Sequence, residues 1–292
     1  MKEFLRIVTT DGFVLSATRF SPENPTNKVI LINSATGVKQ KFYASFATFL
    51  AKEGYTVYTY DYRGIGHSRP KTLRGFKASM RDWGTWDYHT MLQNIFQTHL
   101  NARVVVLGHS VGGQLVALSP LTSKVEGVVM VGAQTPYIRN FTGLGQTLKL
   151  FSFWYFLIPF FTKITGYFPA SKLALFEDLP KGVALQWARW AKSENYMFEE
   201  FPEDQEKFER LAVPALMVNF TDDKLAPVGA VSDLMSRYPQ LKWSQWQLKP
   251  DDIMQKSIGH FGFFKRDVQQ SLWAETATWI GKVLQQRSRR AA

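Results

Sequence analysis

The sequence predicts an α/β fold, with a mostly parallel central sheet and helices on both of its faces. Short apolar segments alternate along the chain with longer amphipathic ones, as strands alternate with helices in such folds. The apolar segments are nearly continuous, which is typical of strands buried on both faces. The 292 residues, 45% of them hydrophobic, are enough for one large domain with an insertion.

The first predicted element is a β-hairpin. Residues Phe4 to Thr9 and Phe13 to Phe20 flank Asp11-Gly12, a pair that favours a tight turn between antiparallel strands. Further strands are expected near residues 28–33, 55–60, 103–107, 125–132, 213–220 and 241–248, and helices near 40–52, 84–99, 110–118, 227–237 and 267–285. Ligands of such sheets bind at the carboxyl ends of the strands, so a site is expected at that edge.

The strand near 103–107 leads into Gly108-His109-Ser110-Val111-Gly112, and the start of an apolar helix follows. So tight a turn brings its first and last residues together, where a Cβ would clash, and both are glycine. The free N–H groups at the helix start face the serine, where they can stabilise an oxyanion. The pattern predicts that Ser110 is a nucleophile whose neighbour His109 points away from it. The alternative is a glycine-rich turn with a capping serine.

A serine in such an elbow is followed along the chain by an acid and then by a histidine. Among the five histidines only His260 lies well beyond Ser110, in a loop before the last helix, and it is the predicted base. The alternative for His260 is a surface loop histidine. Asp222 and Asp223 follow the strand near 213–220, and either could orient the histidine. This pair could also be a solvated helix cap.

These motifs resemble those of the α/β-hydrolases, in particular the branch with monoglyceride-lipase-like and serine-aminopeptidase-like enzymes and many uncharacterised bacterial hydrolases. Residues 61–68, Asp-Tyr-Arg-Gly-Ile-Gly-His-Ser, are similar to a segment that is usually structural in these enzymes. The resemblance covers residues 1–134 and 213–286. It implies the α/β-hydrolase fold, with residues 1–134 and 213–292 as the catalytic domain and residues 135–212 as a helical cap.

The resemblance also implies roles for individual residues. It favours Asp223 as the acid, because Asp223 stands four residues before Pro227, as in the acid turn of many α/β-hydrolases. It implies an oxyanion hole formed by the N–H groups of Ala35 and Val111. The family commonly has His-Gly just before the first of these donors, whereas this chain has Asn-Ser at 33–34, which leaves the shape of the hole open.

The predicted cap contains an aromatic run from Phe151 to Phe161. Lys149 and Lys163 bound a stretch that is too short to span a membrane. Three interpretations remain for this run. It packs the core of the cap, or it lines an apolar acyl pocket in which Trp154 and Phe156 bind the substrate, or it forms a surface for peripheral membrane contact or for a second copy.

The net charge of +11 lies outside the predicted cap, since residues 135–212 hold nine basic and nine acidic side chains. The densest basic patch, at 69–81, has no acid among its members. This loop could attract an anionic substrate or anionic lipid head groups, or it could be a solvated surface. No nucleic-acid-binding motif accompanies it, so no nucleic-acid partner is expected. The patch consists of Arg69, Lys71, Arg74, Lys77 and Arg81.

The sequence therefore predicts a serine hydrolase that cleaves a carboxylic ester, with an apolar acyl group, through an acyl-enzyme. Thioesterases, peptidases and acyltransferases use the same residues, and a non-catalytic binding protein could retain them. No metal or cofactor is expected, and the absence of cysteine excludes disulfides and thiolate chemistry. The N-terminus has no apolar stretch of signal-peptide length, so a cytoplasmic location is expected. The oligomeric state is not indicated.

Overall fold

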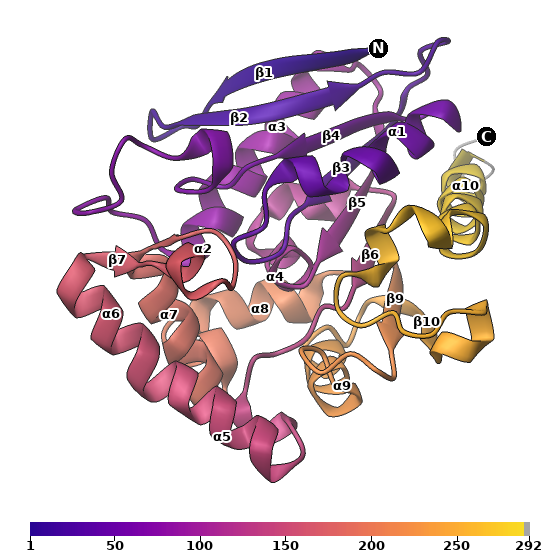
Figure 1. The fold of residues 1–292 in the computed structure, drawn as a ribbon. Helices are drawn as coiled ribbons and strands as arrows, with labels where there is room; N and C mark the ends of the chain where they lie inside the picture. Colours follow the sequence, from indigo (N-terminus) through magenta and orange to yellow (C-terminus); the bar gives the residue numbers. More distant parts are fainter. Residues whose placement is uncertain (289–292) are drawn as a thin grey trace.

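The computed structural model describes residues 1–288, and its centre is one eight-stranded sheet (Figure 1). The strands lie in the order β1-β2-β4-β3-β5-β6-β9-β10, in which β2 is antiparallel to both of its neighbours and the others pair in parallel. The predicted hairpin and mostly parallel sheet are confirmed. The strands are β1 (Lys2–Val8), β2 (Val14–Phe20), β3 (Lys28–Asn33), β4 (Thr56–Tyr60), β5 (Arg103–His109), β6 (Gly127–Val131), β9 (Pro214–Phe220) and β10 (Lys242–Leu248).

Helices follow the strands as the sequence predicts. Several begin with a 3-10 or π turn, and the predicted helix near 110–118 is a short α-helix followed by a 3-10 turn. The helices outside the insertion are α1 (Ala44–Lys52), α2 (Met80–Asp82), α3 (His89–Thr98), α4 (Val111–Gln114), α9 (Val228–Ser236) and α10 (Ala274–Ser288).

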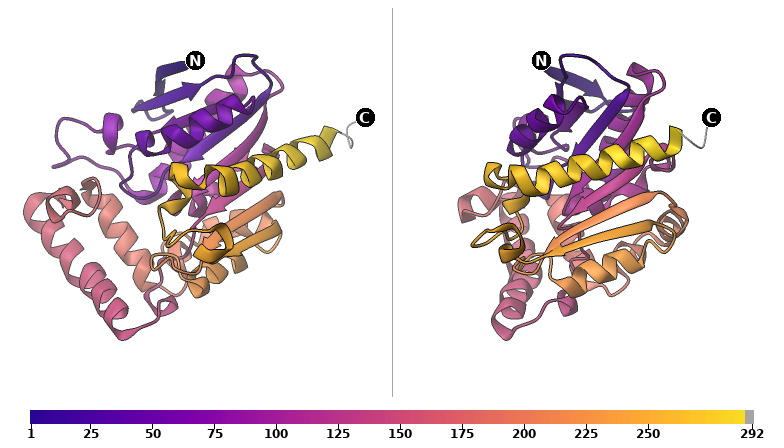
Figure 2. Two further views of the ribbon diagram at one scale, coloured as in Figure 1. Left: turned by 45° about the vertical axis from the view of Figure 1, so that its right-hand side comes forward. Right: turned by 90° about the vertical axis from the view of Figure 1, so that its right-hand side faces the viewer.

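The strands bury both faces, as their continuous apolar sequences predict. In β3, Val29 and Leu31 face one cluster of core side chains, and Ile30 and Ile32 face the other. The first cluster includes side chains of α3 and α9, whereas the second includes those of α1 and α10. Figure 2 shows α10 crossing its face of the sheet. The helices cover the two faces of the sheet, and loops follow the parallel strands at their carboxyl ends.

The segment between β6 and β9 forms a helical insertion beside these carboxyl ends (Figure 1). Its buried side chains, such as Trp154 and Val183, belong to the same core cluster as residues of the sheet and of α3. The insertion is therefore packed onto the body of the protein through a continuous apolar core. Its elements are α5 (Leu144–Ser152), α6 (Ile158–Thr165), β7 (Tyr167–Phe168), β8 (Leu179–Pro180), α7 (Lys181–Lys192) and α8 (Pro202–Arg210).

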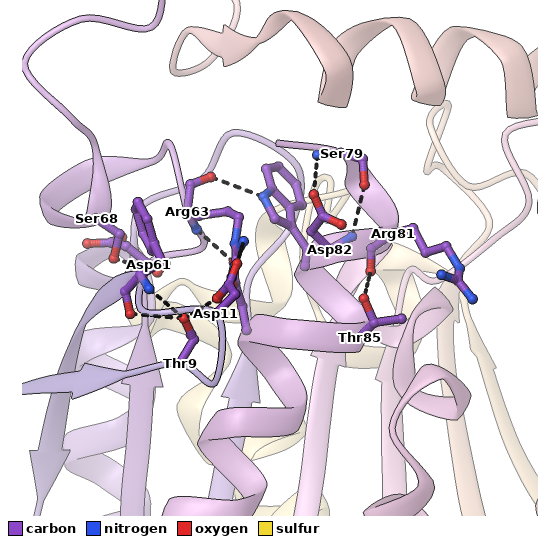
Figure 3. Close-up of polar contacts among 12 residues, drawn as sticks. Thr9, Asp11, Asp61, Arg63, Ser68, Ser79, Arg81, Asp82 and Thr85 are labelled. Carbon is purple, nitrogen blue, oxygen red and sulfur yellow. Dashed lines mark hydrogen bonds and ion pairs between the residues drawn. The ribbon is translucent and has the colours of Figure 1, made fainter. Parts of the chain in front are cut away.

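The segment 61–68 braces the loops after β4, as the resemblance implies (Figure 3). The guanidinium of Arg63 binds Asp87 through Nε at 2.6 Å and the hairpin residue Asp11 through Nη1 at 2.7 Å. Asp61 accepts N–H bonds from Gln40 and His67, so it fixes the turn that carries residues 40–43. Burial raises the pKa of Asp87 to about 7 in spite of Arg63. These bonds tie three loops together at the edge where a site is expected.

Replacing Arg63 by methionine is expected to lower the free energy of unfolding by ~3–5 kcal/mol, because it leaves the carboxyl of Asp87 buried without its cation. Without that cation the pKa of Asp87 rises further in the folded protein, while it stays near 4 in the unfolded chain. Ionisation of this carboxyl in the unfolded chain then lowers the free energy of unfolding once the pH rises above the pKa that Asp87 has there. Urea denaturation should therefore show a larger loss at pH 8 than at pH 5.

Arg81→Met is the matched control, since Arg81 also binds a buried carboxylate, Asp204. Burial acts to raise the pKa of Asp204, but hydrogen bonds from Arg81 and Lys207 outweigh it and lower that pKa. Lys207 still neutralises Asp204 in the control, so the control should lose less stability. A loss for Arg63→Met that is no larger than that of the control, or that shrinks as the pH rises, would contradict this account.

Candidate active site

Ser110 sits in a strained turn between β5 and α4. Its backbone has φ 52° and ψ −120°, a conformation that residues with a side chain rarely adopt and that costs about 1–3 kcal/mol. The glycines permit the turn: a Cβ on Gly108 would lie 2.4 Å from the backbone of Gly112, and one on Gly112 would lie 2.5 Å from the carbonyl oxygen of Asn33. The N–H of Ser110 donates to the carbonyl of Val131 in the next strand. The elbow is therefore held from both sides.

His260 and Asp223 form a buried hydrogen-bonded pair. Nδ1 of His260 lies 2.7 Å from Oδ2 of Asp223. The other oxygen, Oδ1, accepts the N–H groups of Leu225 at 2.8 Å and Ala226 at 3.0 Å. Because both oxygens have donors, the carboxylate is fixed in orientation and can hold the proton of His260 on Nδ1. Of the two adjacent aspartates, Asp223 is the one that binds the histidine ring.

Asp222 binds the same loop through its backbone. Its Oδ2 accepts the N–H of Ile258 at 2.8 Å and that of Gly259 at 3.1 Å. The two aspartates after β9 therefore have different roles. Asp222 binds the backbone just before His260, and Asp223 binds its ring. The sequence alone does not indicate this role of Asp222, because two adjacent aspartates after one strand resemble competitors for one position.

Two residues near the elbow, Gly132 and His109, lie close to the ring of His260. A Cβ on Gly132, which follows the carbonyl that accepts the Ser110 N–H, would lie 3.3 Å from both Asp223 Oδ2 and His260 Nδ1. On the other side His109, directly before the serine, has its ring centroid 4.9 Å from that of His260. The Asp223–His260 pair therefore lies against the end of β6 and against the residue that directly precedes Ser110.

His109 supports the loop of His260. Its Nε2 lies 2.9 Å from the carbonyl oxygen of His260, and its Nδ1 lies 2.9 Å from the hydroxyl of Tyr43. A carbonyl can only accept, so Nε2 carries the proton and Nδ1 accepts from Tyr43. Burial, together with the nearby His260, lowers the pKa of His109 well below its ordinary value, so the ring is neutral.

The N–H groups of the two predicted oxyanion donors, Ala35 and Val111, have different surroundings. Val111 is the first residue of α4, so no carbonyl of its own helix can accept its N–H. The N–H of Ala35 instead donates to the hydroxyl of Tyr43 at 2.8 Å. The N–H of Ala35 therefore already has an acceptor in the structure, and its role as an oxyanion donor stays a prediction. No motif marks Tyr43, which ends the 3-10 turn Gln40–Tyr43 directly before α1.

The two predicted substrate-binding rings point in different directions. Trp154 is buried in the insertion, with its ring centroid 4.6 Å from that of Trp187. Phe156 is 60% exposed and lines an open, shallow depression with Phe160 and Lys163 on the outer surface. The expectation that both rings line one acyl pocket is wrong. Trp154 packs the core of the insertion, and Phe156 lies on its outside.

The basic loop at 69–81 is partly neutralised by carboxylates of the insertion. Arg69 binds Asp178 at 3.1 Å, and Arg81 binds Asp204 at 2.6 Å. These acids lie more than 100 positions further along the chain, so the local charge count could not reveal them. The remaining basic side chains of the loop are Lys71, Arg74 and Lys77.

In the described residues 1–288, no group of three or more potential ligand side chains could hold a metal ion. Within the same range, every helix is too short or too polar to cross a membrane.

Comparisons with known proteins agree with this architecture. A family model described as alpha/beta hydrolase fold matches residues 27–267. No curated protein sequence matches the chain. Similar solved structures include the Pyrococcus furiosus esterase Pf2001, with 16% identity, a TM-score of 0.62, and coverage of 98% of this chain and 91% of that one. A monoacylglycerol lipase of Paleococcus ferrophilus shares 15% identity with a TM-score of 0.59, covering 92% of this chain and 99% of that one.

A thermophilic esterase from Thermogutta terrifontis shares 13% identity with a TM-score of 0.59 and covers 96% of this chain and 99% of that chain. At these identities the likeness establishes the arrangement of strands and helices. The chemistry must be argued from the residues of this chain.

Proposed function

Because the chain belongs to the α/β-hydrolase family, we propose that it is a serine hydrolase that cleaves carboxylic esters. The observation that carries the proposal is the buried Asp223–His260 hydrogen bond beside a serine in a strained elbow. A purely structural serine would need neither the strain nor a fixed histidine next to it.

The proposed reaction has two halves. His260 Nε2 takes the proton of Ser110 Oγ as that oxygen attacks the ester carbonyl carbon, and the imidazolium then protonates the departing alcohol. In the second half a water molecule gives a proton to His260 as it attacks the acyl carbon. His260 then returns that proton to Ser110 Oγ as the bond between Oγ and the acyl carbon breaks, which releases the acid and the free serine. Asp223 keeps the proton of His260 on Nδ1 and stabilises the imidazolium in both halves.

The test of the proposal combines a covalent probe with a substrate panel. A fluorophosphonate should label the purified protein at Ser110, because only an activated serine reacts with it rapidly. p-Nitrophenyl esters of increasing acyl length should be hydrolysed, whereas acyl-CoA and aminoacyl substrates should be poorer. A protein that neither reacts with the probe nor hydrolyses any ester would instead be a binding protein that has kept the fold.

Tyr43 affects the proposed reaction through the oxyanion hole. The N–H of Val111 is one donor, and the N–H of Ala35 becomes the second when the Tyr43 hydroxyl releases it. Breaking one neutral hydrogen bond costs about 1 kcal/mol, which corresponds to about fivefold in rate.

Tyr43→Phe should therefore raise kcat for a short soluble ester by about fivefold, since Ala35 then has no hydroxyl to release. It should also lower stability, because Nδ1 of the buried His109 loses its donor. Tyr55→Phe is a suitable control, since the Tyr55 hydroxyl bonds Ala277 on α10, remote from the elbow. A fall in kcat for Tyr43→Phe, measured when the variant is fully folded, would show that Tyr43 supports the site rather than blocking it.

A further inference from the structure

Exposed apolar side chains are concentrated on one segment of the insertion, from Leu144 to Ile164. Of the nineteen large hydrophobic side chains that are exposed among the described residues, eight lie in these 21 positions. Single exposed hydrophobic residues are common on protein surfaces, but a cluster of this kind indicates a contact surface. The eight are Leu144, Leu148, Phe151, Tyr155, Phe156, Leu157, Phe160 and Ile164.

The segment is a continuous helix, in which a π turn at Phe153–Leu157 joins α5 to α6. The π turn adds one residue, so Phe151 and Phe156 fall on one side, with ring centroids 5.8 Å apart. The opposite side carries Trp154 and Ile158, which are buried. The exposed apolar side chains therefore form a stripe along a helix about 33 Å long, at the outer edge of the molecule in Figures 1 and 2.

The surroundings of the stripe are basic. No aspartate or glutamate occurs from residue 127 to residue 176. Lys149 and Lys163 lie on the helix itself, Nζ of Lys192 lies 5.0 Å from the ring of Tyr155, and Nε of Arg74 donates to the last turn of α6 at 3.0 Å. Within residues 1–288 these four cations form no ion pair with a carboxylate.

We propose that this stripe docks on a bilayer that contains anionic phospholipid. A helix of this kind lies in the interface with its apolar side chains below the head groups, where the flanking cations meet lipid phosphates. A second copy of the chain fits the surface less well, because a symmetric dimer would bring the same four cations towards one another. The charge of the surroundings therefore selects a negatively charged occupant.

Cosedimentation with lipid vesicles tests the proposal without any measurement of hydrolysis. The wild-type protein should bind vesicles of phosphatidylcholine with phosphatidylglycerol at least tenfold more tightly than vesicles of phosphatidylcholine alone. Binding should weaken between ~0.02 and ~0.5 M salt, as the charges become screened. Phe156→Ser with Phe160→Ser should reduce binding at least tenfold, and thermal unfolding would show that the double variant is folded.

The matched control is Phe4→Ser with Val8→Ser, since both side chains are exposed on the edge strand β1, outside the stripe. This control should bind vesicles as the wild type does. Equal binding by the two double variants, or no preference for the anionic vesicles, would overturn the proposal. So would a wild-type dimer in light scattering that the Phe156→Ser, Phe160→Ser variant converts to a monomer, because the occupant would then be a second copy.

Discussion

Replacing Ser110 by alanine is expected to reduce ester hydrolysis by ~10³-fold or more and to abolish fluorophosphonate labelling. Alanine removes only the hydroxyl, and the elbow is held by backbone bonds and by the two glycines that flank it. The free energy of unfolding should therefore change by less than about 1 kcal/mol. The loss of activity is then chemical rather than structural.

The control for this variant is Ser119→Ala, since Ser119 is also a buried serine but lies outside the elbow and bonds His89. It should keep both labelling and turnover. His260→Ala should be about as inactive as Ser110→Ala, because residues that act as a unit do not have additive effects. Persistent labelling of Ser110→Ala would rule out Ser110 as the nucleophile.

Asp223→Asn is expected to lower turnover by about 10⁴-fold, and the hydrogen bonds of the turn explain why. The N–H groups of Leu225 and Ala226 require an acceptor, so the amide oxygen must face them and the NH₂ group must face His260. The ring must then accept at Nδ1, which places its proton on Nε2. In that tautomer His260 cannot take the proton of Ser110.

Asp222→Asn is the matched control, since it changes the neighbouring side chain in the same way. An amide oxygen can replace Oδ2 in accepting the N–H groups of Ile258 and Gly259, so the loop keeps its position. Turnover should fall by less than about tenfold. Rates at saturating ester, together with the pH profile of kcat/KM, would check both variants. Similar losses of turnover for the two variants would contradict these different roles of the aspartates.

Local patterns predict most of the fold and the core of the site. The glycines around Ser110, the apolar strands and the chain order of acid and histidine are all local or ordinal signals, and they lead to Ser110 and His260. Chain order alone could not separate Asp222 from Asp223, but the spacing to Pro227, taken from the resemblance, favoured Asp223, the residue that bonds the ring. The backbone of the turn decides which carboxylate meets the ring.

What the sequence did not reveal also has physical causes. Residues two apart on a helix lie about 200° apart around its axis, so Trp154 and Phe156 could not face one pocket, and the helical period alone would have indicated this. Tyr43 and its contact with Ala35 belong to no motif. The carboxylates that neutralise Arg69 and Arg81 come from the insertion, so only the folded chain reveals them.

The bond between the His109 ring and the carbonyl of His260 joins residues 151 positions apart, and the Asp223–His260 pair spans 37. Contacts of such separation form at a high cost in loop entropy. During synthesis the chain can complete its elbow long before residue 260 leaves the ribosome. Under the proposed mechanism a nascent chain therefore carries a serine without a base, and it is chemically silent until its C-terminal segment docks.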